Sequence, residues 1–188
     1  MRMSNRSGVA LIAVACCLAG GSRVVGQQPS GRAETPSQSM IERGRYLVTI
    51  QDCNGCHTPF NAKGEPDLTR MLSGHPADVK VTAPKLESGW LVAINATNTA
   101  WAGPWGVSYT SNLTSDRVTG IGAWTEQTFI DAIRKGRKSG VGRALLPPMP
   151  WPMYGKMTDD DLKAMFAYLR TIKPIRNAVP PAVVAPQR

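Results

Sequence analysis

Cys53-Asn54-Gly55-Cys56-His57 is the stretch that decides the fold of this 188-residue chain. The pattern Cys-x-x-Cys-His signals covalent haem attachment, in which two thiols add to the porphyrin vinyl groups and the histidine ligates the iron. A thioredoxin-like redox pair would need a βαβ context, and a zinc site would need more ligands than the one other histidine, His75, can supply. The motif therefore predicts one haem c, bound by Cys53 and Cys56, with His57 as an axial iron ligand.

Residues 1–26 have the composition of a secretory signal peptide. Arg2 and Arg6 precede an apolar run from Gly8 to Gly20, and small residues follow before Gln27. The run is short for a bilayer span, which needs roughly 20 apolar residues. Retention of this segment as an anchor is the alternative. We expect export to the periplasm, and the chain's two other cysteines would be lost with the signal.

The formal net charge is +9, or +6 once the three arginines of the predicted signal are removed. A moderate positive charge suits docking to acidic protein or membrane surfaces. The absence of a long basic run, together with export, argues against nucleic acid. A run of charges is often only a solvated face, and the alternative is a docking surface near the haem edge. The densest basic patch consists of Arg134, Lys135, Arg137 and Lys138, followed by Arg143.

Apolar periodicity and capping residues predict helices that begin near Ser39, Thr125 and Thr158. Ser39 and Glu42 form a capping box for the first helix. Gly44 costs that helix about 1 kcal/mol relative to alanine. We therefore expect another helix, the one that follows Thr158, to approach closely at Gly44.

The rest of the chain is irregular in composition. We expect a flexible linker at 27–38, a folded domain at 39–176 and a disordered proline-rich tail at 177–188. Residues 58–123 are rich in Gly, Pro, Asn and Thr, a composition that suits loops wrapped around a cofactor. Within them, residues 90–94 and 107–110 could pair as a small hairpin.

Several segments resemble the class I cytochrome c family, most closely the cytochrome domains of bacterial periplasmic dehydrogenases that oxidise alcohols and aldehydes. The resemblance covers roughly residues 39–175. It implies an all-α fold, with three to four helices and long loops around one haem. Such subunits often carry two or three haem motifs in tandem, whereas this chain has one, which favours a free carrier or a small single-haem subunit. The segments are Ile41–Leu47, Cys53–Pro59, Asn112–Thr114, Thr119–Thr125, Pro148–Pro150 and Ala167–Arg170.

Three methionines precede the last predicted helix and could supply the sixth iron ligand. Met149 lies between two prolines whose fixed φ angles stiffen the loop. Met153 and Met157 are less constrained alternatives, and an open iron position is a further one. The resemblance implies Met149, because in this family the ligand is a methionine followed by proline ahead of the last helix. A thioether ligand raises the haem potential relative to a second histidine.

Other residues of the expected haem environment are less directly marked. His75, followed by proline in a polar loop, is typical of a solvated or turn-forming histidine rather than a ligand. The resemblance implies that a Gly-x-Pro-x-Leu element at Gly64, Pro66 and Leu68 offers a carbonyl to the His57 ring, with Pro66 as the acceptor. Trp124 is the tryptophan that we expect beside the haem.

An iron held by His57 and Met149 would leave no site for substrate, so we expect an electron carrier and not an enzyme. The resemblance implies single-electron transfer between a periplasmic or membrane-bound dehydrogenase and the respiratory chain. Redox partners would be a dehydrogenase, a terminal oxidase or another cytochrome, with membrane association through a partner or a retained N-terminus. The alternative function is haem-based catalysis, or peroxide or gas binding, at an open iron position.

Overall fold

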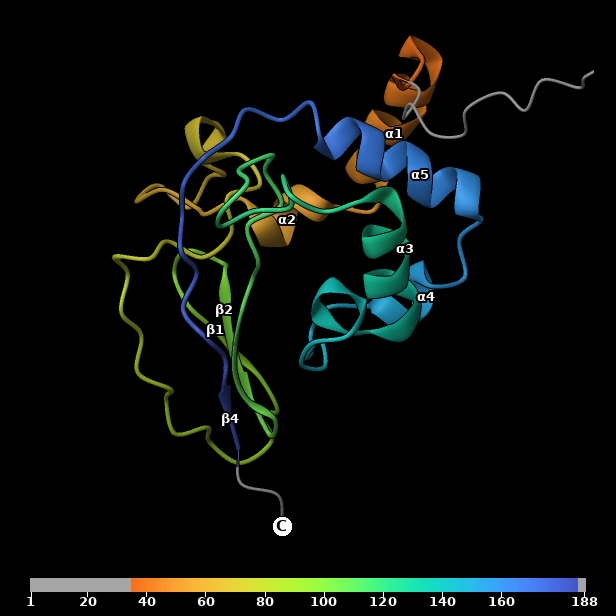
Figure 1. Ribbon diagram of the computed structural model, residues 1–188. Helices are drawn as coiled ribbons and strands as arrows, with labels where there is room; N and C mark the ends of the chain where they lie inside the picture. Colours follow the sequence, from red (N-terminus) through yellow and green to blue (C-terminus); the bar gives the residue numbers. More distant parts are fainter. Residues whose placement is uncertain (1–34, 186–188) are drawn as a thin grey trace, which may run out of the picture. The chain divides into compact units, whose positions relative to one another are not determined.

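The computed structural model describes residues 35–185, so the predicted signal peptide and most of the predicted linker lie outside the described residues. The described part contains five α-helices and a four-stranded antiparallel sheet (Figure 1). No helix within residues 35–185 is long and apolar enough to cross a bilayer. The helices are α1 (Gln38–Ile50), α2 (Cys53–His57), α3 (Glu126–Lys135), α4 (Trp151–Tyr154) and α5 (Asp159–Leu169), with 3-10 turns at Leu68–Arg70 and Lys138–Gly140.

Helix α1 begins earlier than predicted, and its N-cap is Ser37 rather than Ser39. Ser37 has extended backbone angles, and its hydroxyl accepts a hydrogen bond from the amide of Met40 at 3.2 Å. Ser39 is already helical, and its hydroxyl bonds to that of Ser37. The predicted capping box of Ser39 and Glu42 is therefore wrong. Residue type alone could not distinguish the two serines, because Ser37 is equally suited to cap a helix.

Helices α1 and α5 cross at Gly44, as predicted (Figure 1). A Cβ on Gly44 would collide with the carbonyl oxygen of Ala164 and would lie 2.8 Å from the Cβ of Tyr168. The glycine therefore allows the two backbones to touch, and this contact offsets its cost to the helix.

Helices α3 and α5 bury the faces that their periodicity predicts. Thr125 caps α3, and Gly136 ends it with φ of 60°, a left-handed conformation that favours glycine. Thr158 caps α5, as predicted, and the helix ends at Leu169. The buried side chains of the two helices include Phe129, Ile130, Ile133, Leu162, Met165, Phe166 and Leu169.

The sheet differs from the predicted hairpin. The two predicted strands do not pair with each other, because each pairs with a strand between them, β2. That strand is a short Ala-Trp-Ala-Gly segment, and its composition gives little strand signal. The domain is thus mostly helical with a small sheet rather than purely all-α. The strands, in the order β1-β2-β3-β4, are Ala93–Ile94, Ala100–Gly103, Gly106–Tyr109 and Val183–Val184.

The segment 177–185 packs against the domain and is not a disordered tail. Asn177 is buried, and its side chain donates to the carbonyls of Ser73 and His75. Val183 and Val184 form β4, which pairs with β3. The prolines of this segment do not prevent it from being ordered, because the hydrogen bonds and the strand pairing are made by Asn177, Val183 and Val184.

We predict that Gly44→Ala lowers the free energy of unfolding by about 2 kcal/mol, because overpacking against the α5 backbone outweighs the gain of about 1 kcal/mol in helix propensity. Denaturant titration followed by far-UV circular dichroism measures this. Arg45→Ala, at the next and exposed position, is the control and should stay within about 0.5 kcal/mol of wild type. A stabilised Gly44→Ala protein would contradict the close helix contact.

Candidate haem site

Helix α2 holds the Cys-x-x-Cys-His motif, and Asp52 determines where it begins. Asp52 has a left-handed backbone (φ of 50°), and its carboxylate accepts from the amide of Gly55 at 3.1 Å. A Cβ on Gly55 would collide with that carboxylate. The glycine inside the motif therefore lets Asp52 cap this short helix, and Cys53, Cys56 and His57 all line one cavity.

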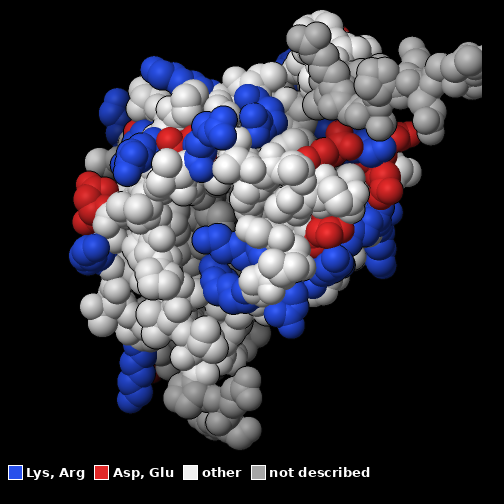
Figure 2. All heavy atoms as spheres, in the orientation of Figure 1, with Lys and Arg blue, Asp and Glu red and all other residues white. Residues whose placement is uncertain are grey.

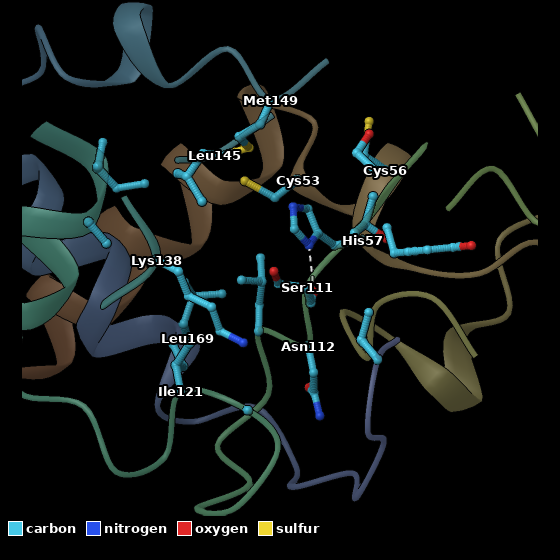
Figure 3. Close-up of a pocket in the computed structure, with 18 of the residues that line it drawn as sticks. Cys53, Cys56, His57, Ser111, Asn112, Ile121, Lys138, Leu145, Met149 and Leu169 are labelled. Carbon is cyan, nitrogen blue, oxygen red and sulfur yellow. Dashed lines mark hydrogen bonds between the residues drawn. The ribbon is translucent and has the colours of Figure 1, made fainter. Parts of the chain in front are cut away.

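His57 is oriented by a backbone carbonyl. Its Nδ1 lies 2.7 Å from the carbonyl oxygen of Ser111, and the residue is buried (Figure 3). Because a carbonyl only accepts, Nδ1 carries the proton and Nε2 keeps a free lone pair. Burial lowers the pKa of His57, which also favours the neutral ring. The free Nε2 faces the cavity beside Cys53 (Figure 3), which is the arrangement that a metal-ligating histidine requires.

The predicted acceptor for His57, Pro66, is wrong. Pro66 is exposed and forms an isolated bridge with Phe60, and Leu68 is 71% exposed. Neither lines the cavity. Ser111 serves instead. The amide of Gly74 bonds to the carbonyl of His57 at 2.8 Å, and the amide of His75 bonds to the carbonyl of Thr110 at 3.0 Å, so one loop joins the motif to the segment that contains Ser111. A backbone acceptor has no side-chain signature, and the only hint in the sequence is that Ser111 precedes the quoted Asn112–Thr114 segment.

The cavity beside the motif has a volume of about 670 Å³, within the range of about 300–1,000 Å³ for cofactor sites. Its wall is mostly apolar and uses the core faces of α3 and α5, through residues such as Phe129, Leu162 and Leu169. The hydroxyl of Thr110, on the same wall, is buried and finds no hydrogen-bond partner within residues 35–185. Two thiols, an imidazole nitrogen, a thioether and an apolar wall fit a haem.

The thiol chemistry argues against a dithiol redox site. Burial, aided by the charge of Asp52, raises the pKa of Cys53 to about 12 and also raises that of Cys56. Redox-active thiols need a lowered pKa, since the thiolate is the nucleophile. Within the described residues, no cluster of three or more His, Cys, Asp or Glu side chains could hold a metal ion. The motif therefore has neither the acidic thiol of a redox pair nor the ligand set of a zinc site.

Met149 is the methionine, among the three that precede α5, that lines the cavity. Its sulfur lies near that of Cys53, on the His57 side of the cavity (Figure 3). Met153 is 62% exposed, and Met157 packs on the core near Gln51. The loop is held on both sides: the Ser108 hydroxyl donates to the Pro147 carbonyl at 2.6 Å, and the Tyr154 hydroxyl donates to the Gln51 carbonyl at 2.9 Å.

Trp124 lies where the sequence predicts, whereas the surroundings of His75 differ from those predicted. Trp124 lines the cavity, as expected. His75 is fully buried rather than solvated: its Nε2 donates to the Val79 carbonyl at 3.0 Å, and its Nδ1 lies 2.8 Å from the Thr99 hydroxyl. Because both ring nitrogens have protein partners, His75 holds loops together and does not act as a ligand in this structure.

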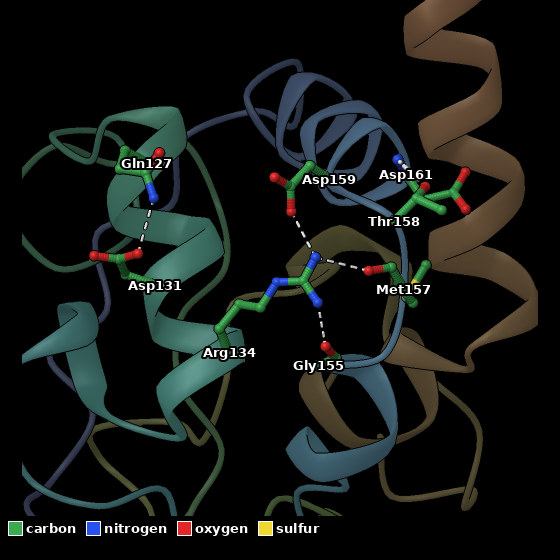
Figure 4. A network of polar contacts seen from close by, with 8 residues as sticks. All are labelled: Gln127, Asp131, Arg134, Gly155, Met157, Thr158, Asp159 and Asp161. Carbon is green, nitrogen blue, oxygen red and sulfur yellow. Dashed lines mark hydrogen bonds and ion pairs between the residues drawn. The ribbon is translucent and has the colours of Figure 1, made fainter.

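The residues of the basic patch differ in whether their side chains bind other elements of the chain. Arg134 pairs with Asp159 at 2.5 Å and donates to the carbonyls of Gly155 and Met157, which ties α3 to the chain between α4 and α5 (Figure 4). Lys135, by contrast, pairs only with Asp131 on its own helix, an exposed contact at 2.9 Å. Arg134 is therefore mainly a structural residue.

The other two members of the patch, Arg137 and Lys138, follow the end of α3. Arg137 donates to the carbonyl of Gly142, and this bond helps to close the loop that carries Lys138. Lys138 lines the cavity, as does the nearby Arg143. Lys and Arg side chains gather around a hollow on the face drawn in Figure 2, so this side of the molecule offers positive charge around an opening.

We predict that Arg134→Ala lowers the free energy of unfolding by about 1–2 kcal/mol, because three acceptors lose a charged donor. Thermal and denaturant unfolding measure this. Lys135→Ala, one residue away, is the control, and its loss should be smaller because its pair is exposed and local. Equal losses in the two variants would show that the Arg134 contacts contribute nothing beyond a surface ion pair.

Comparison with known proteins agrees with this site. The chain is 28% identical over 148 residues to the cytochrome c subunit of the quinone alcohol dehydrogenase of Gluconobacter oxydans (strain 621H), and 29% identical over 159 residues to the fructose dehydrogenase cytochrome subunit of Gluconobacter japonicus. It is 30% identical over 143 residues to the cytochrome c subunit of the gluconate 2-dehydrogenase of Pantoea cypripedii. These alignments cover 78%, 84% and 76% of this chain, but only 24%, 26% and 25% of the three relatives.

A sequence model of the cytochrome c family matches residues 41–173, which hold the attachment motif, the Met149 loop and α5. The resemblance seen in the short motifs is thereby confirmed. The relatives include cytochrome subunits of bacterial dehydrogenases for alcohol, fructose and gluconate. The chain therefore belongs to the cytochrome c family.

Proposed function

We propose that this chain is a mono-haem cytochrome that carries single electrons. The haem is bound covalently through Cys53 and Cys56, and its iron is held between His57 and Met149. The observation that carries the proposal is that Cys53, Cys56, His57 and Met149 line one mostly apolar cavity, with the Met149 sulfur and the free Nε2 of His57 beside Cys53.

The bound haem supplies a ferric/ferrous couple that changes by one electron. The chain's part is to keep the surroundings of that couple unchanged. The Ser111 carbonyl holds the His57 ring, and the bonds at Pro147 and Gln51 hold the loop that carries Met149. If His57 and Met149 both hold the iron, no iron position would be left for substrate, which favours electron transfer over catalysis.

The partners are inferred from the relatives, several of which are named as cytochrome subunits of dehydrogenases. We infer that this chain accepts electrons from a periplasmic or membrane-bound dehydrogenase and passes them toward the respiratory chain. The predicted signal at 1–26 supports export to the periplasm, the setting that such a partner requires.

We predict that Met149→Ala abolishes the sulfur-to-iron charge-transfer band of the ferric protein, lowers its reduction potential and opens the iron to added ligands such as azide. Met153→Ala is the matched control and should change none of the three, because that side chain is exposed and outside the cavity. Visible spectra and redox titration of the holoproteins measure these effects.

Two results would contradict the assignment. If the band were lost in Met153→Ala and kept in Met149→Ala, Met149 would not be the ligand. If the wild-type ferric protein lacked the band and bound azide readily, the iron would have an open position. The haem-based catalytic or ligand-binding alternative would then replace electron transfer.

We also propose that the basic patch steers an acidic partner to the cavity mouth. Lys138 and Arg143 line the cavity, and Lys135 is exposed on α3, three residues after the cavity-lining Ala132. Charges of this kind act mainly on the association rate and lose reach as salt rises, since the screening length is about 10 Å at 0.1 M. The contacts of Arg134 reduce its part in this surface.

We predict that Lys135→Glu slows reduction by a partner dehydrogenase and flattens the dependence of that rate on salt, while the reduction potential stays at the wild-type value. Lys63→Glu is the charge-matched control on an exposed loop away from the cavity, and it should keep most of the wild-type slope. Stopped-flow reduction across a series of ionic strengths is the measurement. Identical slopes in both variants and wild type would mean that the patch is only a solvated face.

A further inference from the structure

We propose that the C-terminal segment 178–181 is a wall of the haem site, held in place by Asn177, and that it raises the reduction potential by excluding water from the cofactor. Asn177 is a positioning residue here, because it touches the wall's neighbours rather than the cofactor. The inference rests on the proposed haem site and concerns its electrostatic tuning.

The first observation is where the segment lies. Ala178, Val179, Pro180 and Pro181 all line the cavity that also contains the Cys-x-x-Cys-His motif. Val179 is partly buried there, and the side chains of all four residues are apolar. A chain segment without polar side chains therefore closes part of the cavity that would otherwise open to solvent.

The second observation is how firmly the segment is anchored. The Asn177 side chain donates to the Ser73 carbonyl at 2.7 Å and to the His75 carbonyl at 2.9 Å, and its oxygen accepts from the Ala77 amide at 3.0 Å. The backbone amide of Asn177 donates to the Thr119 hydroxyl at 2.9 Å. A buried side-chain amide with its donors and acceptor engaged at once specifies a single position for the chain that follows.

The anchor reaches the loop that supports the iron ligand. Ser73 and His75 flank Gly74, whose amide bonds to the carbonyl of His57. The carbonyl of Ile175, two residues before Asn177, accepts from the side chain of Asn112, next to Ser111. The wall is thus joined to both loops that orient the proximal histidine.

The far end of the segment is also seated. Val183 and Val184 pair with β3, and the amide of Ala185 donates to the carbonyl of Trp105 at 3.0 Å. Gly106, with φ of 103°, allows this close passage, because a Cβ there would collide with the Val183 carbonyl. Residues 178–181 are therefore suspended between two fixed points, Asn177 and β4.

Such a wall has a definite electrostatic effect. Ferric iron carries one more positive charge than ferrous iron, so water and polar groups near the haem stabilise the ferric form and lower the potential. An apolar segment that replaces water at the cofactor raises the potential. Polar substitution on its cavity side should reverse this effect, whereas the same substitution on its outer side should not.

The test compares two valine variants of the holoprotein. Val179→Gln places an amide at the cavity and should lower the reduction potential. Val183→Gln places the same amide on β4, where the valine is 58% exposed, and should leave the potential at the wild-type value. Asn177→Ala should lower the potential in the same direction, because the wall loses its anchor. Its control is Asn61→Ala, in an exposed loop outside the cavity.

Redox titration gives the potential, and the ferric charge-transfer band reports separately on Met149 ligation. A fall confined to Val179→Gln and Asn177→Ala, with the band retained, supports the wall. Equal potentials in Val179→Gln and Val183→Gln would overturn it, whether or not Asn177→Ala folds. If the band were missing from the wild-type protein, the proposed axial ligation itself would fail. If instead the band were present in all variants and their potentials were unchanged, the axial ligation would stand and only the wall would fail.

Discussion

The hydrogen bond from His57 to the Ser111 carbonyl is the interaction on which the rest of the site depends. It spans 54 positions in the sequence and decides which ring nitrogen keeps a lone pair. Helix α2 is too short to hold a side chain rigid alone, so the orientation of His57 comes from the loops around it. The amide of Gly74 holds the carbonyl of His57, and the amide of His75 holds that of Thr110, beside Ser111. The long irregular middle of the chain is therefore a support for one imidazole.

The helices complete the site by leaving part of their apolar surface unpaired. Phe129, Ile133, Leu162 and Leu169 belong to the hydrophobic core and also line the cavity. The apolar faces of α3 and α5 are wider than the contact between the helices needs, and the remaining apolar surface faces the haem cavity. The haem thus takes the place of core side chains, and its binding contributes to the stability of the fold, as for any ligand that binds the native state alone. The close crossing at Gly44 fixes α5, which supplies one wall of that space.

Sequence patterns predicted the features that local chemistry determines. The caps at Thr125 and Thr158 and the crossing at Gly44 each depend on residue type at a fixed spacing, and the structure agrees with them. Apart from the cap of α1, where Ser37 takes the place predicted for Ser39, the failures arise where the partner is a distant backbone group. The ring acceptor is the carbonyl of Ser111 rather than Pro66, and the pairing of the strands requires a segment with little strand signal of its own. Order in the C-terminal segment could not be predicted from its prolines, because it comes from bonds that Asn177 makes to residues about a hundred positions away.

Distant contacts also decide what a charged residue does. A basic residue that faces a partner cannot be distinguished in the sequence from one that binds its own chain. Arg134 and Lys135 are neighbours, yet the guanidinium reaches two carbonyls between α4 and α5 and a carboxylate at the start of α5, whereas the ammonium meets one carboxylate on its own helix. The planar, multiply donating guanidinium suits a fixed network of carbonyls, and the single flexible ammonium suits a transient encounter. Only the second kind keeps its charge available to an incoming surface. A docking surface on this face therefore depends less on how many cations the patch contains than on which of them are held by few internal acceptors.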